Sequence, residues 1–361
     1  CSKQGGDNEK LIFKILKRGE KLKIAEAKEE IDLVDGGLRY DLTVPLARYY
    51  ANHANELPSP FKALQIGNVW RADRPQRGRF RQFMQCDIDI IGNASPDAEV
   101  ELILTTTKAL TRIGLSSFKV KINDRRILKA IFTYAGFAEE DHEKLAIIFD
   151  KLDKIGIEGV QKELEENAFD ASAIEKFIAL FESGALDLDS VAKVCDADYV
   201  ASLKYIMDTV TSVSGNAFPI EFTPSLVRGQ GYYTGMVFEI TCPQFSGAVA
   251  GGGRYDNMVG KFLGTQVPAV GFSIGFERVC GILLEQGYQI PGAKQKIALL
   301  YGKDADFTAV LAKAADLRSS YNVTVLQQAK KLGKQLGQLE ASGFSGAAFM
   351  DKDEIKIFAQ Q

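Results

Sequence analysis

The 361-residue sequence has few of the residues on which metal sites and histidine catalysis depend. It contains two histidines and five cysteines, and the cysteines form neither a CxxC pair nor a zinc-ligand spacing. No apolar run reaches the ~18 residues of a membrane span. We expect no signal peptide, and the sequence contains no GxxxxGK(S/T) segment. These absences argue against a metal site, histidine-based catalysis, a membrane protein and a P-loop nucleotide site, and scattered thiols are typical of the reducing cytoplasm.

The overall charge gives no sign of nucleic-acid binding. The 44 Lys and Arg residues face 47 Asp and Glu residues, for a net charge of −3. Any contact with nucleic acid must therefore rest on local basic clusters. The chain begins at Cys1 rather than at a methionine, and we expect an N-terminally shortened form of a longer protein.

Composition changes along the chain and predicts four regions. Residues 1–123 mix helix and strand patterns, whereas residues 124–215 are rich in Lys, Glu, Leu and Ala at helical spacing, which indicates a helical insertion. Residues 216–288 return to strands with many glycines. Residues 296–361 alternate strands and helices, which predicts a small α/β domain with a largely parallel sheet. Its expected elements are strands 297–301 and 323–326 and helices 304–318 and 330–341.

Within these regions several elements have clear signals. Strands are expected over 61–70 and 80–91, separated by a basic loop. Ser95-Pro96-Asp97 predicts a helix start, because Ser caps helices and Pro suits their first turn, and the helix should end near Gly114. A strand over 270–274 leads into a second helix. The apolar positions expected on that helix are Phe276, Val279, Cys280, Leu283 and Leu284.

The strand 83–90 has two different faces. Its even positions are apolar, whereas its odd positions are Phe83, Gln85, Asp87 and Asp89. Successive side chains of a strand point to opposite sides, so one face belongs to a core. The other is either an ordinary solvated sheet face or the wall of a functional site.

The loop before this strand favours the functional interpretation. Five arginines fall within the eleven residues 71–81. Guanidinium groups match phosphate oxygens bidentately and stay charged at any working pH. The loop is therefore either a solvated basic hairpin or a clamp for the phosphates of a nucleotide.

Four blocks of the sequence resemble the class II histidyl-tRNA synthetases. They are 39–48 with 61–92, 226–239, 250–256 and 270–279, and the likeness extends over roughly residues 8–361. It implies an α+β fold, with an antiparallel-sheet catalytic core, a helical insertion and a C-terminal α/β anticodon-binding domain. It also implies an aminoacyl-tRNA synthetase, a ligase that activates L-histidine with ATP to histidyl-adenylate and transfers it to tRNA(His).

For ATP the resemblance implies four contacts. Arg71 would bind the α-phosphate and the carboxylate of histidine, Arg79 the outer phosphates, and Phe83 the adenine ring. Arg278 would hold the γ-phosphate from the opposite side. Mg²⁺ would accompany ATP, and no metal site or permanently bound cofactor of the protein is implied.

For histidine the resemblance implies a polar pocket. Asp41, Thr43 and Gln85 would hold the α-amino group, and Asp89 and Tyr233 would read the imidazole. These assignments suit the chemistry, since an ammonium group needs acceptors and an imidazole N–H needs one.

The same resemblance places the remaining pocket residues. Tyr232 would form a wall, and Gly251 and Gly252 would let the backbone approach the ligand. Arg228 would also contact the bound histidine, and with Arg71 it would be catalytic, because negative charge builds on the α-phosphate as pyrophosphate leaves. The attacking carboxylate is already ionised, so no general base is required.

The sequence also departs from the family. Gln230-Gly231 stands where the family has Leu-Asp, and Phe80 replaces a Tyr. The first class II motif, which builds the dimer interface in this family, is not visible upstream, although the resemblance implies a homodimer for the full-length protein.

Two alternatives remain open beside the synthetase. One is a catalytically inactive, synthetase-like regulatory subunit of histidine biosynthesis, and the other is a degenerate sensor domain. Both would have eroded ATP contacts, whereas the arginines assigned here are present. In the last region Lys330, Lys331 and Lys334 would meet tRNA phosphates or form a solvated helix face.

Overall fold

A computed structural model describes residues 10–182, 186–228, 232–352 and 354–358 of the chain. The chain divides into two structural units, residues 1–286 and residues 287–361. No described helix is long and apolar enough to cross a membrane.

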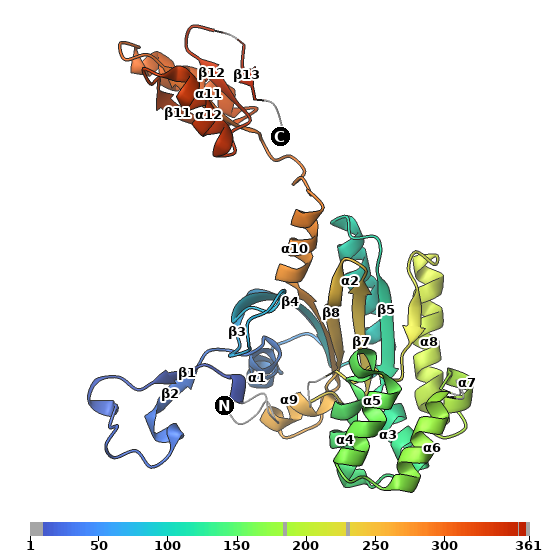
Figure 1. Ribbon diagram of the computed structural model, residues 1–361. Helices are drawn as coiled ribbons and strands as arrows, with labels where there is room; N and C mark the ends of the chain where they lie inside the picture. The colour runs from blue at the N-terminus through green and yellow to red at the C-terminus, as the bar shows by residue number, and fades with distance from the viewer. Residues whose placement is uncertain (1–9, 183–185, 229–231, 353, 359–361) are drawn as a thin grey trace. The chain divides into compact units, whose positions relative to one another are not determined.

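The larger unit is built on a seven-stranded sheet (Figure 1). The spatial order is β3-β4-β9-β8-β7-β5-β6, and every neighbouring pair is antiparallel except β5 and β6. The strands are β3 (Phe61–Trp70), β4 (Gln82–Ile91), β5 (Lys119–Asp124), β6 (Ile220–Phe222), β7 (Met236–Cys242), β8 (Phe245–Arg254) and β9 (Ala269–Gly275). The strands expected over 61–70 and 80–91 thus pair as β3 and β4.

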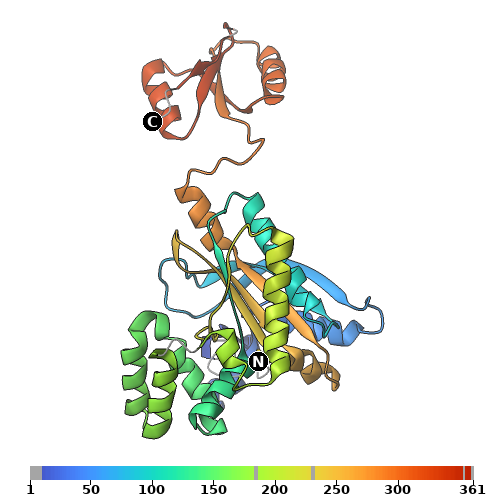
Figure 2. The same ribbon diagram turned by 90° about the vertical axis from the view of Figure 1, so that its right-hand side faces the viewer.

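One face of this sheet carries the main hydrophobic core. Helices α2 (Asp97–Arg112) and α8 (Ala197–Ser214) lie side by side against it (Figure 2). Leu102, Ile103 and Leu110 of α2 are buried among the strand residues. Helix α2 begins at Asp97, one residue later than predicted, with Pro96 rather than Ser95 at the N-cap position, although the Ser95 hydroxyl accepts a hydrogen bond from the Asp97 N–H at 3.3 Å.

The opposite face is covered only in part. Helices α1 (Thr43–His53) and α9 (Asp256–Leu263) contact each other and build a smaller core there. Leu46 and Ala47 of α1 pack with Met258 and Val259 of α9. The rest of this face forms the floor of a cavity.

Between β5 and β6 the described chain is helical. The elements are α3 (Arg125–Ala135), a 3-10 turn (Glu139–Asp141), α4 (His142–Phe149), α5 (Leu152–Glu166), α6 (Ala171–Glu182), α7 (Leu188–Val191) and α8. Aromatic side chains join α3, α4 and α6, with Phe132, Phe149 and Phe177 all in mutual contact. These rings give the helices a compact core of their own.

Helix α10 (Phe276–Glu285) corrects one prediction. Val279 and Ile282 are buried, but Leu284 is 77% exposed and Phe276 is 42% exposed. At 100° per residue the buried stripe runs through 279 and 282, so Leu284 lies on the opposite side of the helix. The predicted stripe followed apolar residue types and missed Ile282.

The smaller unit has a four-stranded sheet in the order β11-β10-β12-β13. The first three strands are parallel and the last is antiparallel, as a largely parallel sheet requires. The elements are β10 (Lys296–Tyr301), α11 (Phe307–Arg318), β11 (Asn322–Gln327), α12 (Leu332–Ala341), β12 (Gly346–Phe349) and β13 (Lys356–Ile357). Strand β12 was not predicted, because Gly-Ala-Ala-Phe contains no β-branched residue.

A short hairpin precedes the sheet in the larger unit. Strand β1 (Lys14–Leu16) pairs antiparallel with β2 (Val34–Gly37), and the 3-10 turns Gly19–Lys21 and Glu30–Leu33 lie between them.

Candidate active site

A row of residues crosses the sheet at right angles to its strands and lines the cavity on every strand of the row except β3. The register makes each residue of this transverse row the direct partner of the next. Directly paired residues share a face, so the row is continuous from strand to strand. It consists of Gln65 (β3), Asp87 (β4), Ser273 (β9), Gly251 (β8), Glu239 (β7) and Lys121 (β5).

The polar face of β4 lies inside this cavity. Gln85, Asp87 and Asp89 are buried, with exposed fractions of 9%, 3% and 3%. On the apolar face Ile90 is buried, whereas Cys86 and Ile88 are only half-buried. The interpretation of an ordinary solvated sheet face is therefore wrong, and the carboxylates point into the interior.

Burial gives these carboxyl groups unusual acidities. Desolvation, followed by repulsion from Asp89, raises the pKa of Asp87 to about 8, although Ser273 opposes the shift through a hydrogen bond. Desolvation also raises the pKa of Asp89 to about 6, against a hydrogen bond from Tyr255. The Tyr255 hydroxyl donates to Asp89 Oδ1 at 2.6 Å. Carboxyl groups with strongly raised pKa values inside a cavity are typical of functional sites.

Several buried polar atoms on the cavity wall have no hydrogen bond within the described chain. They are the acceptors Gln85 Oε1 and Asp89 Oδ2 and the donor Arg228 Nε. Buried polar groups are nearly always paired in folded proteins. Unpaired acceptors near an unpaired donor suit a ligand that carries both N–H donors and a negative group.

Arg228 is held over the centre of the transverse row. Its φ of +59° is unusual for a residue with a side chain, and its Nη1 lies 3.4 Å from Glu239 Oε2. A methyl group on Gly251 would collide with its guanidinium group. Tyr233 also hydrogen-bonds it. Strain of this kind persists where the surroundings enforce it, often at functional sites.

A second arginine is sandwiched between two rings. The Arg71 guanidinium carbon lies 4.2 Å from the centre of the Tyr40 ring and 5.0 Å from that of Phe83. Its Nε donates to the Tyr40 carbonyl at 3.1 Å. These contacts orient the cation and the Phe83 ring within the ligand-free protein.

Arg278 closes the cavity from helix α10. It donates to the carbonyl oxygens of Gly78, at 3.2 Å, and Ala248, and its guanidinium group lies over the Phe245 ring. Burial lowers its pKa, and neighbouring guanidinium groups add to this shift; they belong to Arg79, Arg228 and Arg71. Arginines far apart in sequence therefore converge, and a polyanion would relieve their repulsion.

The opposite end of the cavity is lined by tyrosines. Tyr232 and Tyr233 are in edge contact, with ring centres 4.9 Å apart. Tyr232 hydrogen-bonds Thr43, and desolvation raises its pKa well above the usual range. Asp41, buried beside Thr43, accepts a hydrogen bond from the Val44 N–H at 3.1 Å.

The structure brings the predicted site residues to one cavity. All those assigned to ATP and to histidine line it: Asp41, Thr43, Arg71, Arg79, Phe83, Gln85, Asp89, Arg228, Tyr232, Tyr233, Gly251, Gly252 and Arg278. Gln230 and Gly231 lie outside the described residues. Arg77, by contrast, forms an exposed ion pair with Glu285 at 2.7 Å.

The structure gives the glycines of β8 a reason of their own, beside their predicted role toward a ligand. A methyl group on Gly251 would meet Arg228, and one on Gly252 would meet the Gly271 carbonyl of strand β9. Gly253 likewise leaves room for the Tyr233 ring. These glycines make room for the protein's own side chains and backbone, and the predicted approach of their backbone to a ligand stays a prediction.

Sequence reasoning missed some residues of the site. Asp87, Ser273, Glu239 and Tyr255 all line the cavity but were given no role. The alternation of β4 already placed Asp87 beside Gln85 and Asp89. Ser273 and Glu239 required the strand register, which single-sequence patterns do not provide.

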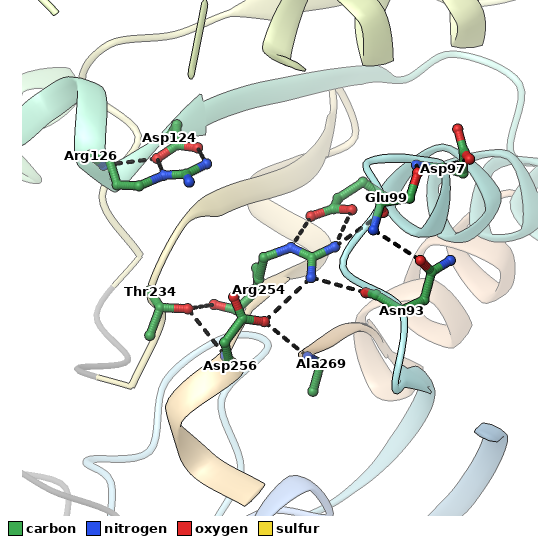
Figure 3. A network of polar contacts seen from close by, with 10 residues as sticks. Asn93, Asp97, Glu99, Asp124, Arg126, Thr234, Arg254, Asp256 and Ala269 are labelled. Atoms are coloured by element: carbon green, nitrogen blue, oxygen red, sulfur yellow. Dashed lines mark hydrogen bonds and ion pairs between the residues drawn. The ribbon is translucent and has the colours of Figure 1, made fainter. Parts of the chain in front are cut away.

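A buried ionic network supports the cavity from behind (Figure 3). Arg254, which follows the glycines, makes a bidentate pair with Glu99 of α2, with both distances 2.6 Å, and also contacts Asp256. Its carbonyl accepts a hydrogen bond from the Thr234 N–H. The network therefore anchors the segment after Tyr233 to the sheet and to α2.

The antiparallel sheet, its flanking helices and the arginine-lined cavity define a class II aminoacyl-tRNA synthetase. The histidyl-tRNA synthetase family model matches residues 30–279. The histidine–tRNA ligase of Leifsonia xyli subsp. xyli is 45% identical over 97% of this chain and 84% of its own length. That of Aeropyrum pernix is 41% identical over 69% of this chain and 58% of its own. The chain belongs to the histidyl-tRNA synthetase family.

Solved structures agree with this fold. The crystal structure of histidyl-tRNA synthetase from Nostoc sp. PCC 7120 matches with a TM-score of 0.70 and 26% identity, over 89% of this chain and 77% of that one. A Bacillus halodurans C structure is described as an ATP phosphoribosyltransferase regulatory subunit/histidyl-tRNA synthetase. It also matches with a TM-score of 0.70, at 20% identity over 96% of this chain and 84% of that one. The second likeness shows the fold alone.

Proposed function

We propose that this chain activates L-histidine with ATP and transfers the histidyl group to tRNA(His). The observation that carries the proposal is the two-ended cavity. Buried acceptors and tyrosines lie at one end, and converging arginines at the other. A histidine molecule supplies the donors and a carboxylate, while ATP supplies the polyanion.

The first step joins the two substrates between these ends. A carboxylate oxygen of histidine attacks the α-phosphorus of ATP, an O–P bond forms, and the bond to pyrophosphate breaks. Arg228, with Arg71, stabilises the charge that builds on the α-phosphate. Arg79 and Arg278 hold the outer phosphates and Phe83 stacks on adenine. In the second step a terminal ribose hydroxyl of the tRNA takes the histidyl group and AMP leaves.

The amino-acid end orients the nucleophile. Asp41, Thr43 and Gln85 hold the ammonium group, and Asp89 and Tyr233 hold the imidazole. Tyr232 closes the wall, and Gly251 and Gly252 set the depth of the floor. The substrate carboxylate then faces the arginines, and orientation of this kind contributes several kcal/mol, on the order of 7–11 in favourable cases.

Mg²⁺ enters with ATP as part of the substrate in this proposal. Among the described residues no group of three or more His, Cys, Asp and Glu side chains could hold a metal ion. The ATP phosphates would therefore supply much of its coordination.

The remaining assignments are also proposals. The helices from 124 to 215 form an insertion within the catalytic region of residues 1–123 and 216–288, and residues 296–361 bind the anticodon. The full-length protein works as a homodimer in the cytoplasm. Lys330, Lys331 and Lys334 are exposed and lie at or before the start of α12, where tRNA phosphates could reach them.

Amino-acid-dependent ATP–pyrophosphate exchange tests the proposal. Each of the twenty amino acids is offered in turn, and charging of tRNA(His) is measured afterwards. We expect exchange with histidine and charging of tRNA(His). Stimulation by another amino acid would overturn the substrate assignment, and stimulation by none would favour the regulatory alternative.

A further inference from the structure

The acceptors in the cavity outnumber those that an imidazole needs. An imidazole N–H requires one acceptor, and the proposed function assigns this role to Asp89, whose Oδ2 is buried without a partner in the described chain. Gln85 Oε1 remains as a second buried acceptor without a partner in the described chain. An ammonium group has three N–H donors, so a set of acceptors around Gln85 would suit it.

Asp87 completes such a set. It is two residues from Gln85 on the same face of β4 and is 3% exposed. Gln85 Nε2 lies 3.5 Å from Asp87 Oδ1 and 3.1 Å from Ser273 Oγ. These contacts occupy the amide nitrogen and leave the amide oxygen as a buried acceptor without a partner in the described chain. Asp41 is close enough for its charge to act on Asp87.

We propose that Asp87 is a further substrate-binding residue, which holds the ammonium group of the amino acid together with Gln85 and Asp41. The inference rests on the proposed function and deepens it. Burying the Asp87 carboxylate costs free energy, because repulsion from Asp89 outweighs the attraction of any described cation. A bound ammonium group would supply the cation that this carboxylate lacks. Arg71, whose charge acts on Asp87 from across the cavity, has a smaller effect than Asp89 or Ser273.

A consequence is that binding releases a proton. In the absence of substrate the pKa of Asp87 is about 8, so at pH 7 most of the population is protonated. A bound ammonium group favours the ionised carboxylate and lowers this pKa, and the proton passes to the buffer. Above pH 8 the group is already ionised, and the release disappears. The titratable and charged groups that face Asp87 are Asp41, Arg71, Asp89, Arg228, Tyr232, Tyr233 and Tyr255.

The test uses the whole chain and three ligands whose binding is measured by calorimetry, without catalysis. L-Histidine and histidinol carry the ammonium group, whereas imidazolepropionate carries the ring and the carboxylate without it. In Asp87→Asn we expect the first two to bind about 10–100-fold more weakly, as for one charge-assisted hydrogen bond. Imidazolepropionate should bind as it does to the unaltered chain.

Two controls separate binding from structural damage. Asp208→Asn, on the exposed side of α8, should change none of the affinities. At pH 7, in buffers of different ionisation enthalpy, Asp87→Asn should release about one proton fewer than the unaltered chain on binding histidinol. The affinity for ATP should be equal in both proteins.

Two results would overturn the inference. One is unchanged histidinol affinity in Asp87→Asn, and the other is an equal loss for imidazolepropionate, which would place the carboxyl group at the ring. A failure of the proposed function would give another result. Histidine-dependent ATP–pyrophosphate exchange would then be absent, while the affinity for histidinol would still depend on Asp87.

Discussion

The two ends of the cavity recognise charge in opposite ways. At the amino-acid end the carboxyl groups are buried, with Asp87 and Asp89 on strand β4, and desolvation raises the pKa values of both. At the phosphate end the arginines come from the loop before β4, from α10 and from the segment that follows β6, and Arg79 is exposed. The amino-acid end gains selectivity because a wrong ligand would leave buried polar groups without hydrogen bonds, which costs free energy of binding. The second gains attraction from converging charge.

Arg228 joins the two ends, and removing it should have the largest effect. In Arg228→Ala we expect histidine-dependent exchange to fall about 100–1000-fold, as when one oxyanion donor is lost. The KM for histidine should change much less than kcat. Steady-state exchange kinetics measure both.

Arg112→Ala, at the exposed end of α2, is the matched control and should retain full exchange. Near-normal exchange in Arg228→Ala would contradict the catalytic assignment.

Gly251→Ala should reduce histidine-dependent exchange in the same way as Arg228→Ala, but to a smaller extent. The added methyl group would displace the Arg228 guanidinium group, and we expect kcat to fall about 10–100-fold, because small displacements at a reacting centre are costly. Gly281→Ala on α10, where a methyl group meets nothing within 4 Å, serves as the control. If the two variants behaved alike, the strand glycine would not position Arg228.

Asp87→Asn should stabilise the ligand-free protein. A raised pKa means that the folded state binds more protons than the unfolded state between pH 3.8 and about 8, so stability falls as pH rises through that window. The variant should gain on the order of 5 kcal/mol at pH 8.5 and little at pH 4, because each pKa unit between the unfolded and folded values corresponds to about 1.4 kcal/mol. Thermal unfolding at both pH values measures this. An equal effect at the two pH values would show that ionisation of Asp87 is not the cause.

Arg79→Ala should have the smallest effect. Arg79 is exposed, so we expect the KM for ATP to rise about 3–10-fold, with a difference that shrinks as salt screens the charge. Arg77→Ala is the control, because Arg77 pairs with Glu285 on the surface. A salt-independent loss would indicate that Arg79 is buried against the phosphates when ATP is bound.

The contrast between the two ends also explains what could be predicted. Alternation along 83–90 placed Gln85 and Asp89 on one face, and register later showed that this face is the cavity floor. The clustered arginines of 71–81 indicated a phosphate site, yet residue types alone could not separate Arg79 from Arg77. The prediction of the buried stripe of α10 was wrong at Phe276 and Leu284, because an apolar residue need not be buried.

The sequence by itself determined the strands around the basic loop, the start of α2 to within one residue, the alternation of β4 and the family resemblance, since all of these are local patterns. Only the tertiary structure decided which residues meet. Strand pairing placed Asp87, Ser273, Gly251 and Glu239 in one row. Packing set Arg228 above Gly251 and brought Arg278 to the same cavity as Arg71. The physical reason is that register, burial and desolvation depend on contacts between distant segments, and these turn ordinary carboxyl groups into binding groups.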